Sequence, residues 1–320
     1  MVLLVAKVGK RYTKLDNHRY HLRRGKSEAL SSSLEAFRSD VSNGLNKLLV
    51  NSKPRLEILS FSWIQKCFEL ITVANKAFAK LVADMDYPMS KWEAASVEGY
   101  LRYSLNLLQF LNSISSSLSQ LGQARLKIAY ALSLVEESPL SALERLKASQ
   151  PTSFNKEFRK EYRRENGKEM SCSGKDTAIH EAMMVMEGLG FWVCGILLSA
   201  LCGEAKPYLE VREFSGRLVV FSSSFTRLDS SICEAIMEKE SELTEVKELK
   251  DAMVHLVADI TSGKRTDAAE ELQRKLEVFE KLLESLEKEV DHLFKEVLSG
   301  RNKLPTAMDS ENNNFHLHSV

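Results

Sequence analysis

The stretch that decides the fold is Leu272–Val297, which reads LQRKLEVFEKLLESLEKEVDHLFKEV. Its large apolar residues follow one another at spacings of four and three, without interruption, at Leu272, Leu276, Phe279, Leu283, Leu286, Val290, Leu293 and Val297. This heptad spacing places an apolar seam along one face of an α-helix and is typical of helices that pack lengthwise against other helices. Ser299-Gly300 follows directly, and we expect it to end the helix.

Helical periodicity recurs along most of the remaining chain. Apolar residues recur at helical spacing over further segments, at about 30–48, 62–86, 90–135, 140–148, 182–203, 218–236 and 243–262. The 90–135 helix is expected to begin with a capping box formed by Ser90 and Glu93, and Gly122 is a place where it can kink or split.

Composition supports the same fold class. The 320 residues include only 6 Pro and 14 Gly, and the tight turns of sheet proteins require more of both. Apolar residues make up 44% and charged residues 28%, which excludes a disordered chain. The sequence therefore predicts an all-α fold, an elongated bundle of long antiparallel helices with a C-terminal heptad helix.

Changes in composition divide the chain into five regions. We expect a basic flexible arm over 1–26, an N-terminal helical region over 27–149 and a charged linker over 150–176. A C-terminal helical region over 177–304 and a disordered tail over 305–320 follow. The linker alternates acidic and basic residues between Asn155 and Lys168, with few apolar side chains.

The N-terminal arm has the strongest local charge. Eight basic residues against one acidic residue, Asp16, give a balance of +7; they are Lys7, Lys10, Arg11, Lys14, Arg19, Arg23, Arg24 and Lys26. Such an arm is attracted to an anionic membrane surface, and it is also typical of organelle transit segments or of a solvated tail. The whole chain has 44 basic and 44 acidic residues, so nucleic-acid binding is not expected.

The segment Ala182–Gly203, AMMVMEGLGFWVCGILLSALCG, is the most apolar in the chain. Sixteen residues separate Glu187 from Glu204, whereas a bilayer requires about 20 apolar residues. We favour a buried helix of the bundle and keep a membrane span as the alternative. Gly195, Ser199 and Gly203 stand four apart and predict a face on which another helix packs closely, inside or outside a membrane.

Catalytic and metal-binding motifs are not found in the sequence. His180-Glu181 lacks the second histidine of a zinc-protease helix, and Gly188-Leu-Gly190 lacks the third glycine of a dinucleotide fingerprint at the required spacing. Five widely spaced cysteines favour core positions over disulfides or zinc. We expect no enzyme, no cofactor and no metal.

One short motif indicates a protein partner. Arg145 precedes Ser149 by four residues, and Pro151 follows it by two. A phosphate on Ser149 would offer an epitope for a 14-3-3 protein, in which an arginine cluster captures the phosphate. The alternative, which we favour, is an ordinary helix end.

Three segments resemble the plant BYPASS family. They are LSFSWIQKCFELITVANKAFAKLVADMDYPMSKWE at Leu59–Glu93, LSQLGQARLKIAYAL at Leu118–Leu132 and VDHLFKEVLSGRNKL at Val290–Leu304. The most specific elements are Ser62-Trp63 and Leu298–Arg301, and the resemblance extends over about 27–304. The arm, the linker and the tail lie outside the shared pattern.

Membership in this family implies a helical plant protein without known catalytic residues. It implies a role in root and shoot development, in which the founding protein restrains a mobile signal from the root. A related branch binds a subunit of the exocyst, a membrane-tethering complex, and some members associate with membranes.

We therefore expect a non-enzymatic protein that acts by protein–protein interaction. The alternative is a membrane-associated adaptor in exocyst-linked secretion, and an enzyme of signal metabolism is a more distant one. The expected location is cytoplasmic with membrane association. A single-pass protein held by 182–203 and an organelle protein targeted by the arm remain the alternative locations.

Overall fold

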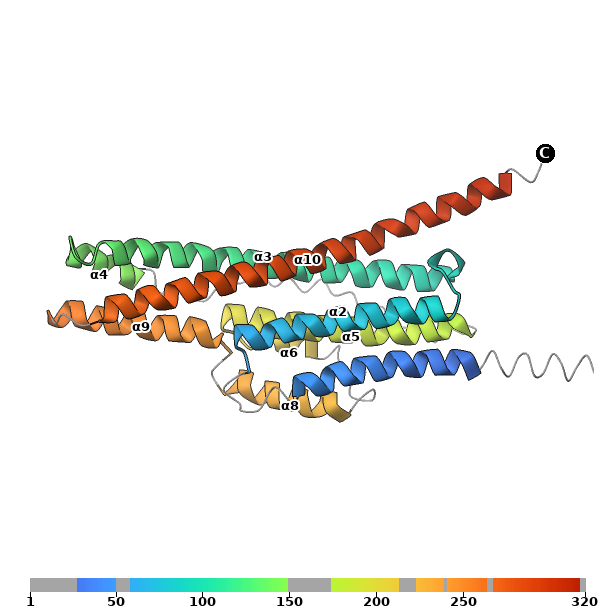
Figure 1. Ribbon diagram of the computed structural model, residues 1–320, viewed down its shortest axis with the longest axis horizontal. Helices are drawn as coiled ribbons and strands as arrows, with labels where there is room; N and C mark the ends of the chain where they lie inside the picture. The colour runs from blue at the N-terminus through green and yellow to red at the C-terminus, as the bar shows by residue number, and fades with distance from the viewer. Residues whose placement is uncertain are drawn as a thin grey trace, which may run out of the picture.

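The helices lie nearly along one long axis, as Figure 1 shows for a computed structural model of the chain. The structure describes residues 28–49, 58–148, 174–212, 223–238, 241–263 and 267–316, with side chains as far as Asn302. Within these ranges every regular element is helical, and the predicted all-α fold is confirmed.

The helices follow one another in a simple order. A helix over 28–49 precedes the labelled elements, which are α2 (Phe61–Asp84), the 3₁₀ helix η2 (Met89–Lys91), α3 (Ala94–Ser133), α4 (Pro139–Ala148), α5 (Lys175–Cys202), α6 (Lys206–Arg212), α8 (Ser223–Met237), α9 (Thr244–Ser262) and α10 (Ala268–His316).

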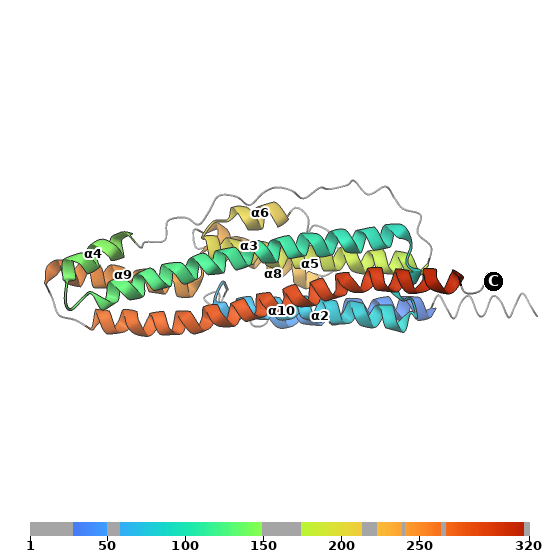
Figure 2. The ribbon, with the colours of Figure 1, turned by 90° about the horizontal axis from the view of Figure 1, so that it is seen from above.

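The two longest helices, α3 and α10, run antiparallel along the bundle (Figures 1 and 2). The heptad seam of α10 packs on α3, α9 and α2 of the same chain. All eight seam side chains are exposed by 7% or less. The seam is therefore satisfied inside the molecule.

The outer face of α10 is held by charge pairs within the helix. In each pair the acid precedes the base: Glu271 pairs with Arg274 and Lys275, and Glu284 pairs with Lys288. This orientation stabilises a helix by roughly 0.3–0.5 kcal/mol per pair. The helix continues through Ser299-Gly300 to His316, into the region predicted as a tail. The predicted helix end was wrong because one helical glycine costs only about 1 kcal/mol relative to alanine.

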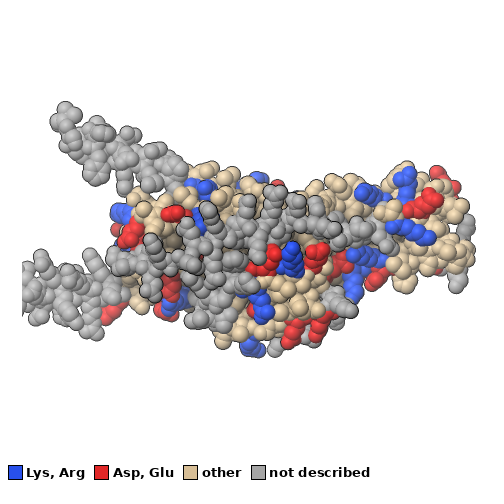
Figure 3. All heavy atoms as spheres, turned by 180° about the vertical axis from the view of Figure 1, so that it is seen from behind, with Lys and Arg blue, Asp and Glu red and all other residues tan. Residues whose placement is uncertain are grey.

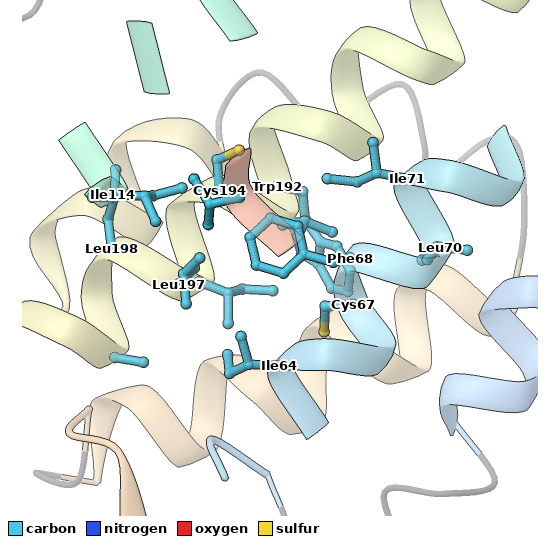
Figure 4. Close-up of a cluster of buried hydrophobic side chains, with 14 of the residues drawn as sticks. Ile64, Cys67, Phe68, Leu70, Ile71, Ile114, Trp192, Cys194, Leu197 and Leu198 are labelled. Atoms are coloured by element: carbon cyan, nitrogen blue, oxygen red, sulfur yellow. The ribbon is translucent and has the colours of Figure 1, made fainter. Parts of the chain in front are cut away.

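The apolar segment 182–203 lies in α5, which is the central helix of the bundle. Helices α2, α3 and α6 pack around it, and its side chains interdigitate with those of α2 and α3 in Figure 4. In the described part of the chain, α5 is the one helix long and apolar enough to cross a membrane. Its most apolar window of 18 residues is 89% buried inside the bundle.

The N-terminal and C-terminal helical regions share one core. A single cluster of buried apolar side chains extends from Phe37 to Val297. It forms because α2 and α3 of the first region contact α5 and α10 of the second. The charged linker therefore connects two parts of one folded unit.

Two local predictions about α3 were wrong. Gly122 does not divide α3, which is one helix of 40 residues. Ser90 lies in η2, and the residue that precedes α3 is Glu93, whose side chain makes no capping bond. The missing cap is supplied by a residue far away in sequence, Asp176.

Candidate functional site

Asp176 joins the N-terminus of α3 to the N-terminus of α5. Its side chain is buried, and Oδ1 accepts hydrogen bonds from the backbone N–H of Glu93 at 3.1 Å and from Ser96 Oγ at 2.8 Å. Oδ2 accepts from the hydroxyl of Tyr87 at 2.5 Å. A carboxylate favours this position because the first N–H groups of a helix have no partner within the helix.

Groups around Asp176 complete this junction. Lys175 Nζ donates to the carbonyl oxygens of Met85 and Asp86, at the end of α2. Burial raises the pKa of Tyr87 to about 12, and the neighbouring Asp176 adds to the rise. The phenol therefore keeps its proton at physiological pH and remains a donor. The ends of α2, α3 and α5 are fixed at one point.

Asp229 forms a second buried junction between α5, α6 and α8. Its Oδ1 accepts from Trp192 Nε1 at 2.9 Å and from Tyr208 Oη at 2.5 Å, and its Oδ2 accepts from Arg212 Nε at 2.9 Å. Burial raises the pKa of the Tyr208 phenol, and Asp229 reinforces that rise. Three donors converge on one carboxylate, which thereby connects the three helices.

Glu245, in the first turn of α9, binds the N-terminus of α2. Both carboxylate oxygens accept from the backbone N–H of Phe61, at 3.1 and 3.2 Å. Ser60 accepts from the N–H of Trp63 beside it. Burial raises the pKa of Glu245, whereas its backbone hydrogen bonds act in the opposite direction.

Sequence analysis missed these three carboxylates for one reason. Glu245 stands 184 positions from Phe61, Asp176 83 positions from Glu93, and Asp229 37 positions from Trp192. Periodicity reports the face of one helix and carries no information about partners this distant. The local sequence gave no signal either, because Asp176 stands between Lys175 and Thr177 and Asp229 between Leu228 and Ser230, and neither interrupts an apolar run.

The predicted row of small residues, Gly195, Ser199 and Gly203, does not act as one face: the first two contact α6, and the third ends α5. A Cβ atom on Gly195 would lie 2.0 Å from Val211 Cγ2 and 3.3 Å from the Pro207 oxygen, so α6 packs directly on this glycine. Ser199 is fully buried, and its Oγ accepts from the N–H of Tyr208 at 2.9 Å. Gly203 ends α5 with a φ of +66°, a conformation that favours glycine.

The other predicted sites lie partly outside the described residues. Arg145 stands in α4, with its guanidinium 4.6 Å from the centre of the Tyr130 ring. Ser149, Pro151 and all the basic residues of the arm lie outside the described ranges. Phosphate-dependent docking at Ser149 and membrane attraction of the arm stay predictions.

The residues that carried the family resemblance are packing residues. Trp63 is fully buried at the start of α2. At the other end of the chain, a Cβ atom on Gly300 would lie 2.6 Å from the Tyr100 hydroxyl. Arg301 Nη1 donates to the carbonyl oxygen of Leu101 at 2.6 Å and to Ser104 Oγ at 3.1 Å. Leu298–Arg301 thus fastens α10 to the beginning of α3.

The groups available for chemistry are few in the described part of the chain. No three His, Cys, Asp or Glu side chains there are placed to hold a metal ion. Cys67 and Cys194 are buried, and burial raises the pKa of both thiols, which makes them poor nucleophiles. On the face in Figure 3, acidic and basic side chains are interspersed over the described surface.

Curated plant proteins are similar to this chain in sequence. UPF0496 protein 4 of Oryza sativa subsp. japonica is 27% identical over 247 residues, which make up 69% of this chain and 53% of that protein. The protein of the same name from Oryza sativa subsp. indica is 26% identical over 247 residues, again 69% of this chain and 53% of that protein. The chain thus spans about half the length of these two rice relatives.

A third relative covers most of both chains. Protein BPS1, chloroplastic, of Arabidopsis thaliana is 24% identical over 311 residues, 87% of this chain and 85% of that protein. No solved structure matches the chain. The family model described as Protein BPS1 matches residues 89–304, the part that includes α3 to the Leu298–Arg301 element. Because this match covers more than half of the sequence, the chain belongs to the BYPASS-like plant family of BPS1 proteins.

Proposed function

We propose that this protein is a non-enzymatic helical scaffold that acts by protein–protein interaction in root and shoot development, where it restrains a mobile signal from the root. One observation carries the proposal: the carboxylates of Asp176 and Asp229, which are buried, and of Glu245, which is half-buried, each connect the ends or faces of different helices. The hydrogen bonds of these carboxylates fix the helices relative to one another. We therefore expect the protein to act through contacts at its surface.

The family match supports the developmental role. The matched residues 89–304 contain the longest helices and the junctions at Asp176 and Asp229. A bundle held in this way presents its surface groups in fixed relative positions over a long axis, which favours specific binding of partners.

Proximity labelling in root cells tests the proposal. The labelling enzyme is fused to the full chain, and the matched control is a chain carrying Asp229→Ala, which we expect to loosen the bundle. A restricted set of proteins should be labelled by the parent chain, bind it directly when purified, and be lost with the control. Purified chain that binds none of these proteins but converts a small molecule would contradict the scaffold and favour the enzyme of signal metabolism.

The second candidate is a membrane-associated adaptor in exocyst-linked secretion. The observation that favours it is the balance of +7 over residues 1–26. Basic residues near an anionic surface contribute about 1 kcal/mol each, and salt screens the attraction. Deletion of 1–26 should therefore abolish salt-sensitive binding to phosphatidylserine vesicles and leave helicity unchanged. Labelling of exocyst subunits in cells would add direct support.

The Ser199→Leu variant distinguishes between two hypotheses, an α5 buried in the bundle and an α5 that spans a membrane. In the bundle, the larger side chain overpacks the contact with α6 and removes the acceptor of the Tyr208 N–H, so stability should fall. In a spanning helix the change increases hydrophobicity and should strengthen retention of the protein in carbonate-washed membranes. Full stability with stronger retention would favour the anchored protein.

The arm also supports an organelle location as an alternative. The Arabidopsis relative is named chloroplastic, and the arm of this chain is basic and poor in acids. A fluorescent fusion of the full chain should lie in the cytoplasm and at membranes if our proposal holds. Plastid import that requires 1–26 would overturn that location.

A further inference from the structure

The outward face of α3 carries a second stripe with heptad spacing, which we call the α3 stripe. Its residues follow one another at spacings of four and three, and each is exposed; they are Leu105, Gln109, Asn112, Ser116, Ser119, Gln123 and Leu126. Leu105 is 46% exposed and Leu126 57%.

This face has no charged side chain over most of its length. Between Arg102 and Arg125 the sequence contains no acid and no base, although 28% of the chain is charged. A solvated helix face normally carries charges. The amides and hydroxyls of this stripe both donate and accept hydrogen bonds, so the surface can pair with a copy of itself.

The order of residues is nearly the same in both directions. If two copies of α3 lie antiparallel with a two-fold axis near Ser116, Leu105 of one copy faces Leu126 of the other. Gln109 then faces Gln123, and Asn112 faces Ser119. The two side chains of each pair are compatible, because the leucines form an apolar contact and the amide and hydroxyl groups can hydrogen-bond to one another. The small serines near the axis allow the two helices to approach closely.

We propose that a second copy of this chain binds the α3 stripe, antiparallel, to form a two-fold symmetric dimer. An interface between two identical surfaces of this kind is the commonest form of oligomer. The contact extends over about 32 Å at 1.5 Å per residue. Zero net charge on the chain removes long-range repulsion between copies. The stripe is mostly polar, so the dimer belongs to the weak class of interfaces.

The stripe has a defined boundary at its C-terminal end. Tyr130, the next residue at this spacing, has Arg145 of α4 stacked on its ring. The dimer contact therefore ends near Leu126, before α4. This limits the pairing to the symmetric segment and sets its register.

Analytical ultracentrifugation of the full chain over a range of concentrations is the first test. The parent should show a monomer–dimer equilibrium. Ser116→Arg places two like charges near the axis and should weaken dimerisation at least tenfold. Ser230→Arg, at an exposed position of α8, is the matched control and should dimerise like the parent. Circular dichroism melts verify that both variants fold.

Cross-linking with a short bismaleimide tests the orientation. Leu105→Cys mixed with Leu126→Cys should give a dimer, whereas either variant alone should give no more than the parent, whose own cysteines are the background. Ser116→Cys should cross-link to itself. A monomer at all concentrations, a dimer unaffected by Ser116→Arg, or cross-linking of Leu105→Cys alone would each overturn the proposal. Protection of Ser116→Cys from maleimide in a monomer would assign the stripe to a segment of the same chain.

Discussion

Asp229 shows, at the scale of single residues, how one side chain connects several helices. Its carboxylate receives Trp192 from α5, Tyr208 and Arg212 from α6, and itself belongs to α8. Removing the carboxylate deprives the buried Trp192 N–H of its acceptor, leaves the Tyr208 hydroxyl only the backbone oxygen of Asp229, and breaks the ion pair with Arg212. The cost is therefore larger than the value of any one of the hydrogen bonds.

We expect Asp229→Ala to lower the free energy of unfolding by about 1–3 kcal/mol, the cost of leaving a buried donor without its acceptor. Urea denaturation followed by circular dichroism measures this change. Asp251→Ala, at an exposed position of α9, is the control and should stay within about 0.5 kcal/mol of the parent. Equal values for the two variants would show that the junction does not stabilise the fold.

Glu245 gives a prediction about pH. Burial raises its pKa above the usual 4.5, so the folded state binds its proton more tightly than the unfolded state. The stability that this group contributes is present below 4.5 and is lost as pH rises through the raised pKa. In Glu245→Gln the side-chain amide oxygen still accepts from the N–H of Phe61, but the amide does not titrate. The loss of stability with rising pH should therefore disappear in this variant.

The measurement is the free energy of unfolding of the parent and of Glu245→Gln as a function of pH. Relative to the variant, the parent should lose stability as pH rises above 4.5. Glu287→Gln, on the exposed face of α10, should follow the profile of the parent. A constant difference between the parent and Glu245→Gln at all pH values would contradict the assignment.

At the scale of helices, periodicity predicted the elements well. Most apolar positions of α2, α3 and α10 are buried as the spacing required, and Leu105 and Leu126 of α3 are exceptions that stay exposed. The ends were predicted less well, because an end depends on what caps it. α3 begins where Asp176 of another region satisfies its first N–H group. α10 passes the glycine at 300, where Gly300 lies against Tyr100 and Arg301 donates to the carbonyl oxygen of Leu101.

Substitution of glycine by alanine should have opposite effects in α5, where α6 packs closely, and in α3, where Gly122 has open space. Gly195→Ala places a methyl group against Val211 and should lower stability by about 1–3 kcal/mol. Gly122→Ala, in α3, meets no atom within 4 Å and should raise stability by roughly 0.5–1 kcal/mol through helix propensity. Thermal and urea melts of the two variants compare them directly. The same sign for both would refute the close approach of α6.

At the scale of the whole molecule, one core replaces the two halves that the linker suggested. Buried residues from Phe37 to Val297 form a single cluster, and the helices of each region fill gaps left by the other. Neither region is expected to fold alone, because the apolar face of α5 would lose α2 and α3.

Limited proteolysis tests this view. Trypsin should cut first between Lys156 and Lys168, in the charged linker. Because both regions share the core, the two fragments should elute together from a gel-filtration column and separate only in denaturant. The intact chain without trypsin serves as the elution standard. Fragments that separate in native buffer, or early cuts within 64–85 or 272–297, would contradict a single core.

The sequence by itself determined the helices, the burial of the seam and the apolar character of α5. These properties depend on spacing along one chain segment, and spacing is local. It also indicated the family, because Leu298–Arg301 is a short and specific element that lies within the family match over residues 89–304, whereas Ser62-Trp63 lies outside that match.

Only the tertiary structure decided which polar groups meet. Asp176, Asp229 and Glu245 find their partners through the crossing of helices that are distant in sequence. The same crossing decided that Gly195 faces α6 and that the residues of the α3 stripe are exposed. A buried carboxylate is stable only where donors converge in space, and no periodic pattern along the chain specifies that convergence.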